Sequence, residues 1–218
     1  MGWSYGPSKH FTWKGGQKII DRRAECDDLF NWTSKGEDGT AYGCTVVKSS
    51  VVGSVYYAAV RRWKGTPTDV VDTRAVVCLT HTCTKDYCDF GYKVLGEDMG
   101  PNESKCPVTI LDLLDPLNDE NDKNGWARAW RDRCREHAAK CRAARAAQLK
   151  LPAGVTATYR GRHWYIGSDA FRTETGYRFC QYLSTGRSDA IRSFMKRYGT
   201  EEQKAEFVRL NPSEAAAA

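Results

Sequence analysis

The spacing of apolar residues in the first third of the chain predicts one helix followed by strands. Between Ile20 and Phe30 the apolar residues recur at helical intervals among charged ones, which predicts an amphipathic helix over 19–31. Three later segments are rich in β-branched and aromatic residues and predict strands: 44–50, 54–63 and 73–82. Small residues around Gly53 predict that the first two strands form a hairpin.

The middle of the chain alternates between irregular and helical patterns. Glycines and prolines predict an irregular segment over 90–106, and Pro107 and Pro116 bound a short helix. An Ala- and Arg-rich segment over 124–150 then predicts one long helix.

The last third begins after the helix breaker LPAGV, in which Pro152 and Gly154 interrupt the pattern. Short apolar and aromatic runs separated by glycines predict twisted strands, and two helices follow over 187–210. The fold class expected is α+β: a small antiparallel sheet flanked by helices with one long basic helix, then a small β-rich C-terminal region that ends in helices. The expected division is an α+β domain over 1–150, a C-terminal region over 151–214 and an alanine tail over 215–218.

Composition places the chain among ordinary globular proteins, with 41% hydrophobic and 28% charged residues. No apolar run is long enough to span a membrane, and the N-terminus lacks the apolar core of a signal peptide. Nine cysteines at irregular spacings then indicate reduced thiols. We therefore expect a cytoplasmic protein with no membrane association.

The net charge of +6 is concentrated in one segment. Residues 124–150 hold eight Lys or Arg and two acids, which gives 8 − 2 = +6. Such asymmetry favours an anionic partner, either nucleic acid or an acidic host protein. The alternative is a solvated helix face, or neutralisation by the acidic segment LDLLDPLNDENDK at 111–123.

Within the long helix, four arginines fall in a stripe about 60° wide at 100° per residue. They are Arg128, Arg131, Arg135 and Arg142. Almost no acids stand at matching positions, so pairing within the helix does not neutralise them. The hypothesis is that this stripe contacts the partner while Trp126 and Trp130 anchor the opposite side. Charge reversal at Arg131 and Arg135 is then expected to leave the fold intact.

Two other groups are candidate contacts with a nucleic acid or protein partner. In the predicted hairpin, Lys48, Tyr57 and Arg61 are expected on one exposed face, because strand side chains alternate. In the C-terminal region, the motif YRGRHWYIG interleaves basic and aromatic residues that can hold phosphates and stack bases. Its candidate residues are Arg160, Arg162 and Trp164.

The sequence predicts neither cofactor nor metal. The segment 46–63 lacks the Gly-Lys pair of a P-loop and reads as two strands. The weak zinc candidates are His81, Cys83, Cys88 and Cys106, whose spacing is unlike that of a structural zinc site. Cys134, His137 and Cys141 share one helical face, which is interpreted as the buried seam of the long helix.

Acidic residues crowd the predicted loop over 85–103, namely Asp86, Asp89, Glu97 and Asp98. Paired carboxylates serve acid–base or metal chemistry. They support the alternative function of a nucleic-acid-processing or nucleotide enzyme. Solvated loop acids are the simpler interpretation, and the sequence favours a protein without catalysis.

Several motifs resemble a family of uncharacterised proteins encoded by conjugative elements, plasmids and phages. The motifs are MGW at the start, DRRAECD at 21–27, KSSVVGSVYYAAV at 48–60, KDYCDFGYK at 85–93 and EDMGPNESKCPVTILDLLDP at 97–116. The resemblance covers about residues 1–150 and carries no established activity or catalytic residue. It implies a mobile-element setting. The function expected is a non-catalytic accessory protein that binds nucleic acid or a host protein, for example an inhibitor of a defence system.

Overall fold

The structure is a computed structural model that describes residues 2–85, 88–171, 179–184 and 186–214. The chain divides into two compact units, residues 1–142 and 143–218. The division falls inside the long helix, whereas the sequence placed a boundary after residue 150.

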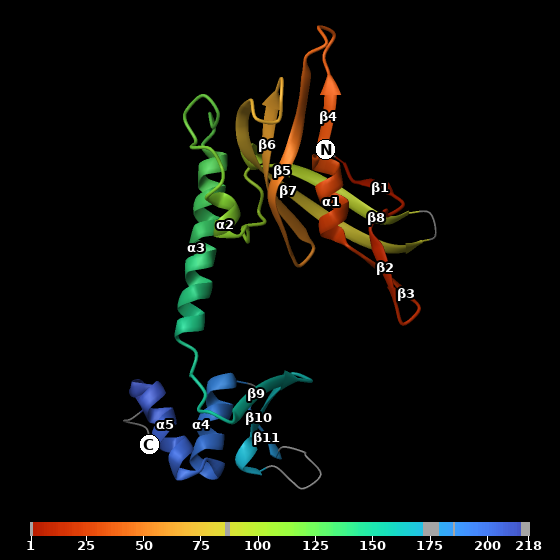
Figure 1. The fold of residues 1–218 in the computed structure, drawn as a ribbon. Coiled ribbons are helices and arrows are strands. Elements are labelled where there is room, and N and C mark those ends of the chain that lie inside the picture. The colour runs from red at the N-terminus through yellow and green to blue at the C-terminus, as the bar shows by residue number, and fades with distance from the viewer. Residues whose placement is uncertain (1, 86–87, 172–178, 185, 215–218) are drawn as a thin grey trace. The chain divides into compact units, whose positions relative to one another are not determined.

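Unit 1 is built on a six-stranded sheet in which every neighbouring pair of strands is antiparallel (Figure 1). The order is β1-β8-β7-β6-β5-β4. The strands are β1 (Ser4–Gly6), β4 (Trp32–Lys35), β5 (Ala41–Val52), β6 (Val55–Lys64), β7 (Val70–Lys85) and β8 (Cys88–Gly96). A separate two-stranded hairpin joins β2 (Phe11–Lys14) to β3 (Gln17–Ile20).

The sheet is larger than the small sheet that was predicted, because part of the predicted irregular segment forms β8. Phe90 and Val94 of β8 pack with the core on one face of the sheet, as alternate residues of a strand do. Gly91, which suggested a loop, lies opposite Tyr5 of β1. A Cβ at this position would meet the Tyr5 ring at 2.4 Å, so the glycine allows the tyrosine to cross the strand.

The predicted hairpin around Gly53 is present. Val52 of β5 pairs with Val55 of β6, and Gly53 in the turn has a φ of +65°. A left-handed conformation of this kind favours glycine. Because a strand and no helix follows the turn, the segment lacks the strand–loop–helix arrangement of a phosphate-binding loop.

Replacing Gly53 with valine is expected to lower the free energy of unfolding by about 1–2 kcal/mol. No atom lies within 4 Å of the added Cβ, so the cost comes from the backbone conformation and not from crowding. Denaturant unfolding measures the change. Gly53→Asn is the matched control, since asparagine tolerates the left-handed region. A valine variant as stable as the wild type would show that the turn does not require this conformation.

One face of the sheet is covered by α1 (Arg22–Phe30). Cys26 of this helix joins a core that includes Tyr56, Ala58 and Phe90. The helix begins later than predicted because 19–20 belong to β3, and because the Asp21 carboxylate accepts hydrogen bonds from the first backbone N–H groups.

The opposite face carries η1 (Glu97–Met99), α2 (Val108–Leu111) and α3 (Trp126–Ala146). Trp130 and Cys134 of α3 pack with Ile110 and Leu111 against Tyr57 and its neighbours in the sheet. The segment 124–150 that predicted a long helix contains α3, and the first half of this helix supplies one wall of the core. Its first turn is capped by the carboxylate of Asp122, which accepts the N–H groups of residues 127 and 128.

Unit 2 contains a three-stranded antiparallel sheet of order β11-β10-β9 and two helices. The elements are β9 (Val155–Arg160), β10 (His163–Ser168), η2 (Asp169–Phe171), β11 (Phe179–Ser184), α4 (Arg187–Tyr198), α5 (Glu201–Leu210) and η3 (Pro212–Glu214). Ile166, Ile191, Phe194 and Phe207 form the centre of its core. The α+β class is thus confirmed for the chain. The predicted alanine tail lies outside the described residues.

In the part of the chain that the structure describes, no helix combines the length and apolar character needed to cross a membrane.

Candidate functional site

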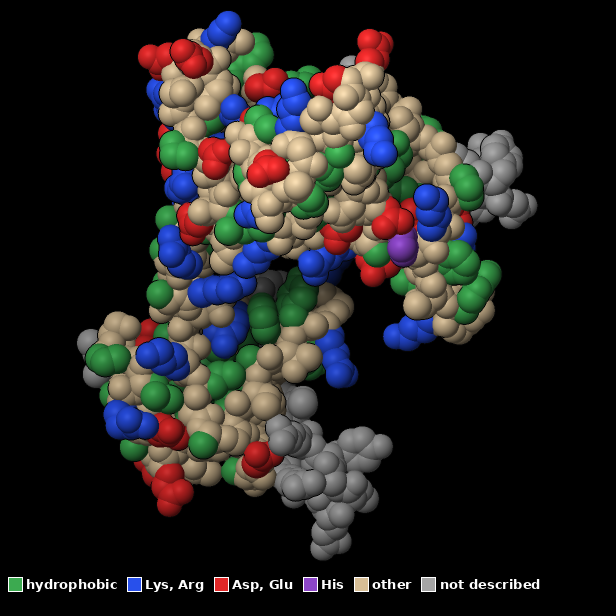
Figure 2. Space-filling view, turned by 45° about the horizontal axis from the view of Figure 1, so that its top comes forward, with side chains coloured by type: hydrophobic (Ala, Val, Ile, Leu, Met, Phe, Trp, Pro, Cys, Tyr) green, Lys and Arg blue, Asp and Glu red, His purple; other side chains and the backbone are tan. Residues whose placement is uncertain are grey.

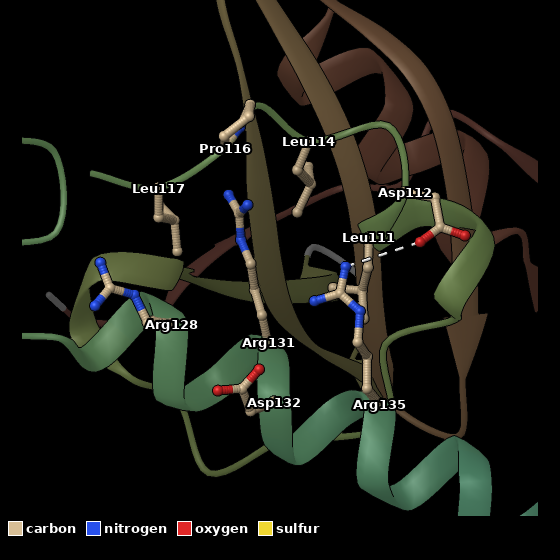
Figure 3. Close-up of a pocket in the computed structure, with 9 residues that line it drawn as sticks. All are labelled: Leu111, Asp112, Leu114, Pro116, Leu117, Arg128, Arg131, Asp132 and Arg135. Carbon is tan, nitrogen blue, oxygen red and sulfur yellow. Dashed lines mark ion pairs between the residues drawn. The ribbon is translucent and has the colours of Figure 1, made fainter.

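Three of the four predicted arginines line a groove of about 440 Å³ in unit 1, between α3 and the chain that follows α2 (Figure 3). Its lining residues are Leu111, Asp112, Leu114, Pro116, Leu117, Arg128, Arg131, Asp132 and Arg135. Leucine side chains form the opposite wall, and the charged groups come mainly from α3. The three arginines differ in their burial and in their ion-pair partners.

Arg131 does not belong to an exposed stripe, because it is only 6% exposed. Its Nε and Nη2 donate to the two carboxylate oxygens of Glu97 at 2.8 and 2.9 Å, and its Nη1 donates to the Asp115 carbonyl at 2.7 Å. Figure 3 shows its side chain pointing from α3 toward the opposite wall. The assignment of Arg131 as a partner contact is corrected on this geometry, since its guanidinium is engaged inside the unit.

The pair formed by Arg131 and Glu97 belongs to a buried network that ties α3 to the sheet. Glu97 is 4% exposed and also accepts the N–H of Ala75 at 3.4 Å. Asp115 and Thr73 are joined twice: the Asp115 carboxylate accepts the Thr73 N–H, and the Thr73 carbonyl accepts the Asp115 N–H. The acid that pairs with Arg131 is thus Glu97, which lies before the acidic segment, and among the described residues the Asp115 carboxylate is engaged by the Thr73 backbone and not by an arginine.

Arg128 and Arg135 differ from Arg131 because their side chains are 54% and 48% exposed. Arg128 lies 3.7 Å from Asp119, and Arg135 lies 3.8 Å from Asp112. Both carboxylates are themselves well exposed, and solvated pairs at such distances contribute about 0–1 kcal/mol. These two guanidinium groups are consequently free to exchange their partner for a stronger anion.

Arg142 continues the same side of α3 and is exposed, without an ion pair among the described residues. The three exposed arginines are spaced by seven residues, so they lie on one side of the helix and span about 21 Å at 1.5 Å per residue. We call Arg128, Arg135 and Arg142 the α3 arginine row. Figure 2 shows Lys and Arg side chains gathered along the part of unit 1 to which α3 belongs.

Lys48 and Arg61 lie on β5 and β6 and are exposed, but Tyr57 is not. Tyr57 is 1% exposed and belongs to the core beneath α3. The prediction of one exposed face that includes Tyr57 is therefore wrong, because α2 and α3 cover the middle of that face. The neighbouring Arg62 hydrogen-bonds Asp72 and thereby lowers the pKa of that carboxyl.

The C-terminal candidates lie together on the β9–β10 hairpin of unit 2. Arg160 and Arg162 are exposed, and Trp164 is half-buried. The Trp164 ring is 5.2 Å from the ring of Tyr159 and 5.8 Å from the Arg187 guanidinium. Sequence reasoning did not single out Tyr159, although the alternation of side chains along the strands would have placed it beside Trp164.

The weak zinc candidates occupy separate environments. His81 is exposed and contacts the Trp3 ring, whereas Cys106 is buried in the core beneath α3. Burial raises the pKa of the Cys106 thiol. Cys83 lies on β7, and the side chain of Cys88 is outside the described residues. Across the described residues, no three His, Cys, Asp or Glu side chains are grouped as a metal site requires.

The cysteines of α3 do not form one buried seam. Cys134 is fully buried, but Cys141 is exposed and its Sγ lies 3.6 Å from Nε2 of His137. The prediction of a continuous seam fails at the second half of α3, where most residues are exposed. Only the first half of the helix packs on the sheet.

The acids of the 85–103 segment do not converge in the described structure. Asp89 on β8 accepts hydrogen bonds from Ser8 and Lys18. Burial alone would raise the pKa of Asp89, but these hydrogen bonds hold it below its usual value. Glu97 directly follows β8, eight residues and about 26 Å from Asp89 at 3.3 Å per residue, and it is paired with Arg131. Asp86 lies outside the described residues.

No known protein family, curated protein or solved structure matches the chain. The assignment of a function rests on the geometry of the described residues.

Proposed function

We propose that this is a non-catalytic accessory protein that binds nucleic acid through the α3 arginine row. The observation that carries the proposal is that Arg128, Arg135 and Arg142 are exposed on one side of α3 and have no strong partner. Arginine presents a planar fork that matches phosphate oxygens. A row about 21 Å long can contact several phosphates of one strand.

Nucleic acid accounts for this surface better than an acidic protein does. The arginines are repeated along one direction, and the segment that contains them holds the whole positive excess of the chain. Regular phosphate charges match such a repeat without specific contacts to bases. A mobile element, in which the protein would act against a host defence system, is the biological setting of the proposal and rests on the sequence resemblance.

Neutralising two arginines of the row is expected to weaken nucleic-acid binding without unfolding the protein. The test compares the full chain with the double variant Arg135→Gln and Arg142→Gln on a labelled DNA duplex, at several salt concentrations. Each lost phosphate contact reduces the magnitude of the salt slope by about 0.9, so the two together reduce it by up to about 2. The melting temperature should stay close to that of the wild type, because both side chains are exposed.

The matched control is Lys35→Gln with Lys64→Gln. These lysines are exposed at the ends of β4 and β6, and the double change removes the same charge. The proposal requires that the control keep the wild-type salt slope. Equal effects of the two double variants would show that net charge matters and the row does not. If the wild type does not bind DNA but does bind an acidic protein, the partner is a protein and the nucleic-acid proposal is wrong.

A further inference from the structure

The β9–β10 hairpin of unit 2 is basic and aromatic at its tip. Its two strands and turn, residues 155–168, contain two arginines and one histidine but no Asp or Glu. At the tip, Tyr159, Arg160 and Arg162 are all exposed. The positive charge is therefore not balanced within the hairpin, and it lies next to an aromatic ring.

Tyr159 extends the apolar face of the hairpin beyond the core. Ala157 and Ile166 on the same face pack with the helices of unit 2. Trp164 is opposite Tyr159 and packs against the edge of this core. Tyr159 remains 56% exposed although its ring centroid is 5.2 Å from that of Trp164. A supported ring with an open side is a suitable surface for a planar group.

Arg162 occupies a backbone conformation that arginine rarely adopts. It has a φ of +74° and follows Gly161, whose φ is +53°. Among the described residues it is the one non-glycine residue with a positive φ. Glycine or asparagine would occupy this turn position with less strain. The turn holds an arginine here at the expense of local stability, which points to a use for its side chain.

We infer that the tip of the β9–β10 hairpin is a binding site for single-stranded nucleic acid. An unpaired base stacks on Tyr159, and Arg160 and Arg162 contact the flanking phosphates. Bases in a duplex are already stacked on one another, so a duplex would leave the Tyr159 ring unused. This inference rests on the proposed function and adds to it a second, chemically different contact, which takes single-stranded nucleic acid.

Removal of the Tyr159 ring tests the stacking. With the full chain and a labelled thymidine oligonucleotide, Tyr159→Ala should weaken binding about 5- to 150-fold, the range found for loss of one stacked base. Tyr159→Trp should retain the affinity, because tryptophan also stacks, whereas Tyr159→Leu should behave like alanine. Duplex binding should change little in all three variants. Equal oligonucleotide affinity of wild type, alanine and leucine variants would overturn the inference.

Arg162→Gly gives a second test that does not depend on the tyrosine. Glycine relieves the strained conformation, so the melting temperature should rise, while oligonucleotide affinity should fall several-fold. A purely structural turn would gain stability without losing affinity, and that result would contradict the inference.

If the Arg135 and Arg142 double variant loses duplex binding while the hairpin variants bind like wild type, only the hairpin site fails. If the wild type binds neither probe, the proposed function fails as well.

Discussion

Replacing Arg131 with methionine is expected to lower the free energy of unfolding of unit 1 by about 3–5 kcal/mol, the usual cost of breaking a buried ion pair. The variant leaves the Glu97 carboxylate buried without its two guanidinium hydrogen bonds. It also leaves the Asp115 carbonyl without its donor. Methionine fills much of the volume of the arginine stem. The decrease in the free energy of unfolding therefore measures the missing polar contacts and not a cavity. Chemical denaturation measures it.

Two comparisons make this prediction specific. Arg135→Met removes an exposed arginine of the same helix and should change stability by less than about 1 kcal/mol. Adding Glu97→Gln to Arg131→Met removes the buried charge and should recover a substantial part of the loss. If Arg131→Met were as stable as Arg135→Met, Arg131 would be a surface residue, and its place among the partner contacts would be restored.

Trp130→Ala is the second change with a large expected effect, about 3–5 kcal/mol of lost stability. The Trp130 side chain is fully buried, and its indole N–H donates to the Glu103 carbonyl at 2.9 Å. Its removal leaves a cavity between α3 and the sheet and an unsatisfied carbonyl. Thermal or denaturant unfolding should show a marked decrease in the stability of unit 1.

Trp126→Ala is the natural control, because it lies one helical turn earlier and is 54% exposed. Its effect should be within about 1 kcal/mol, as for most surface substitutions. The sequence pattern placed both tryptophans on one anchoring face of the helix. In the structure only Trp130 is buried, and Trp126 is exposed. Similar losses for the two variants would mean that the start of α3 packs more deeply than the described structure indicates.

Periodicity in the sequence was sufficient to predict the elements that have strong local patterns. The hairpin around Gly53 and the long helix are present because β-branched alternation and helical spacing are local properties. The size of the sheet was not predicted. Strand β8 contains two glycines, Gly91 and Gly96, which are turn signals in a sequence. Its pairing with β7 and β1 depends on contacts between distant parts of the chain.

The contacts of single side chains in the candidate site could likewise be predicted from the sequence only in part. Helical spacing correctly placed four arginines on one side of α3, but it could not show which of them meets a buried acid. Glu97 lies 34 residues before Arg131 in the sequence and is brought to it by the packing of α3 on the sheet. The same packing buries Trp130 and leaves Trp126 in solvent.

The most direct test of the central claim is the salt dependence of DNA binding by the unmodified full chain. If the α3 arginine row binds phosphates, the logarithm of the association constant should fall linearly with the logarithm of salt concentration. Three arginine contacts give a slope of about −2.7 on a duplex, at 0.9 per phosphate. A fluorescence anisotropy titration at several salt concentrations measures this slope. An affinity that does not change with salt, or no binding at low salt, would contradict the account.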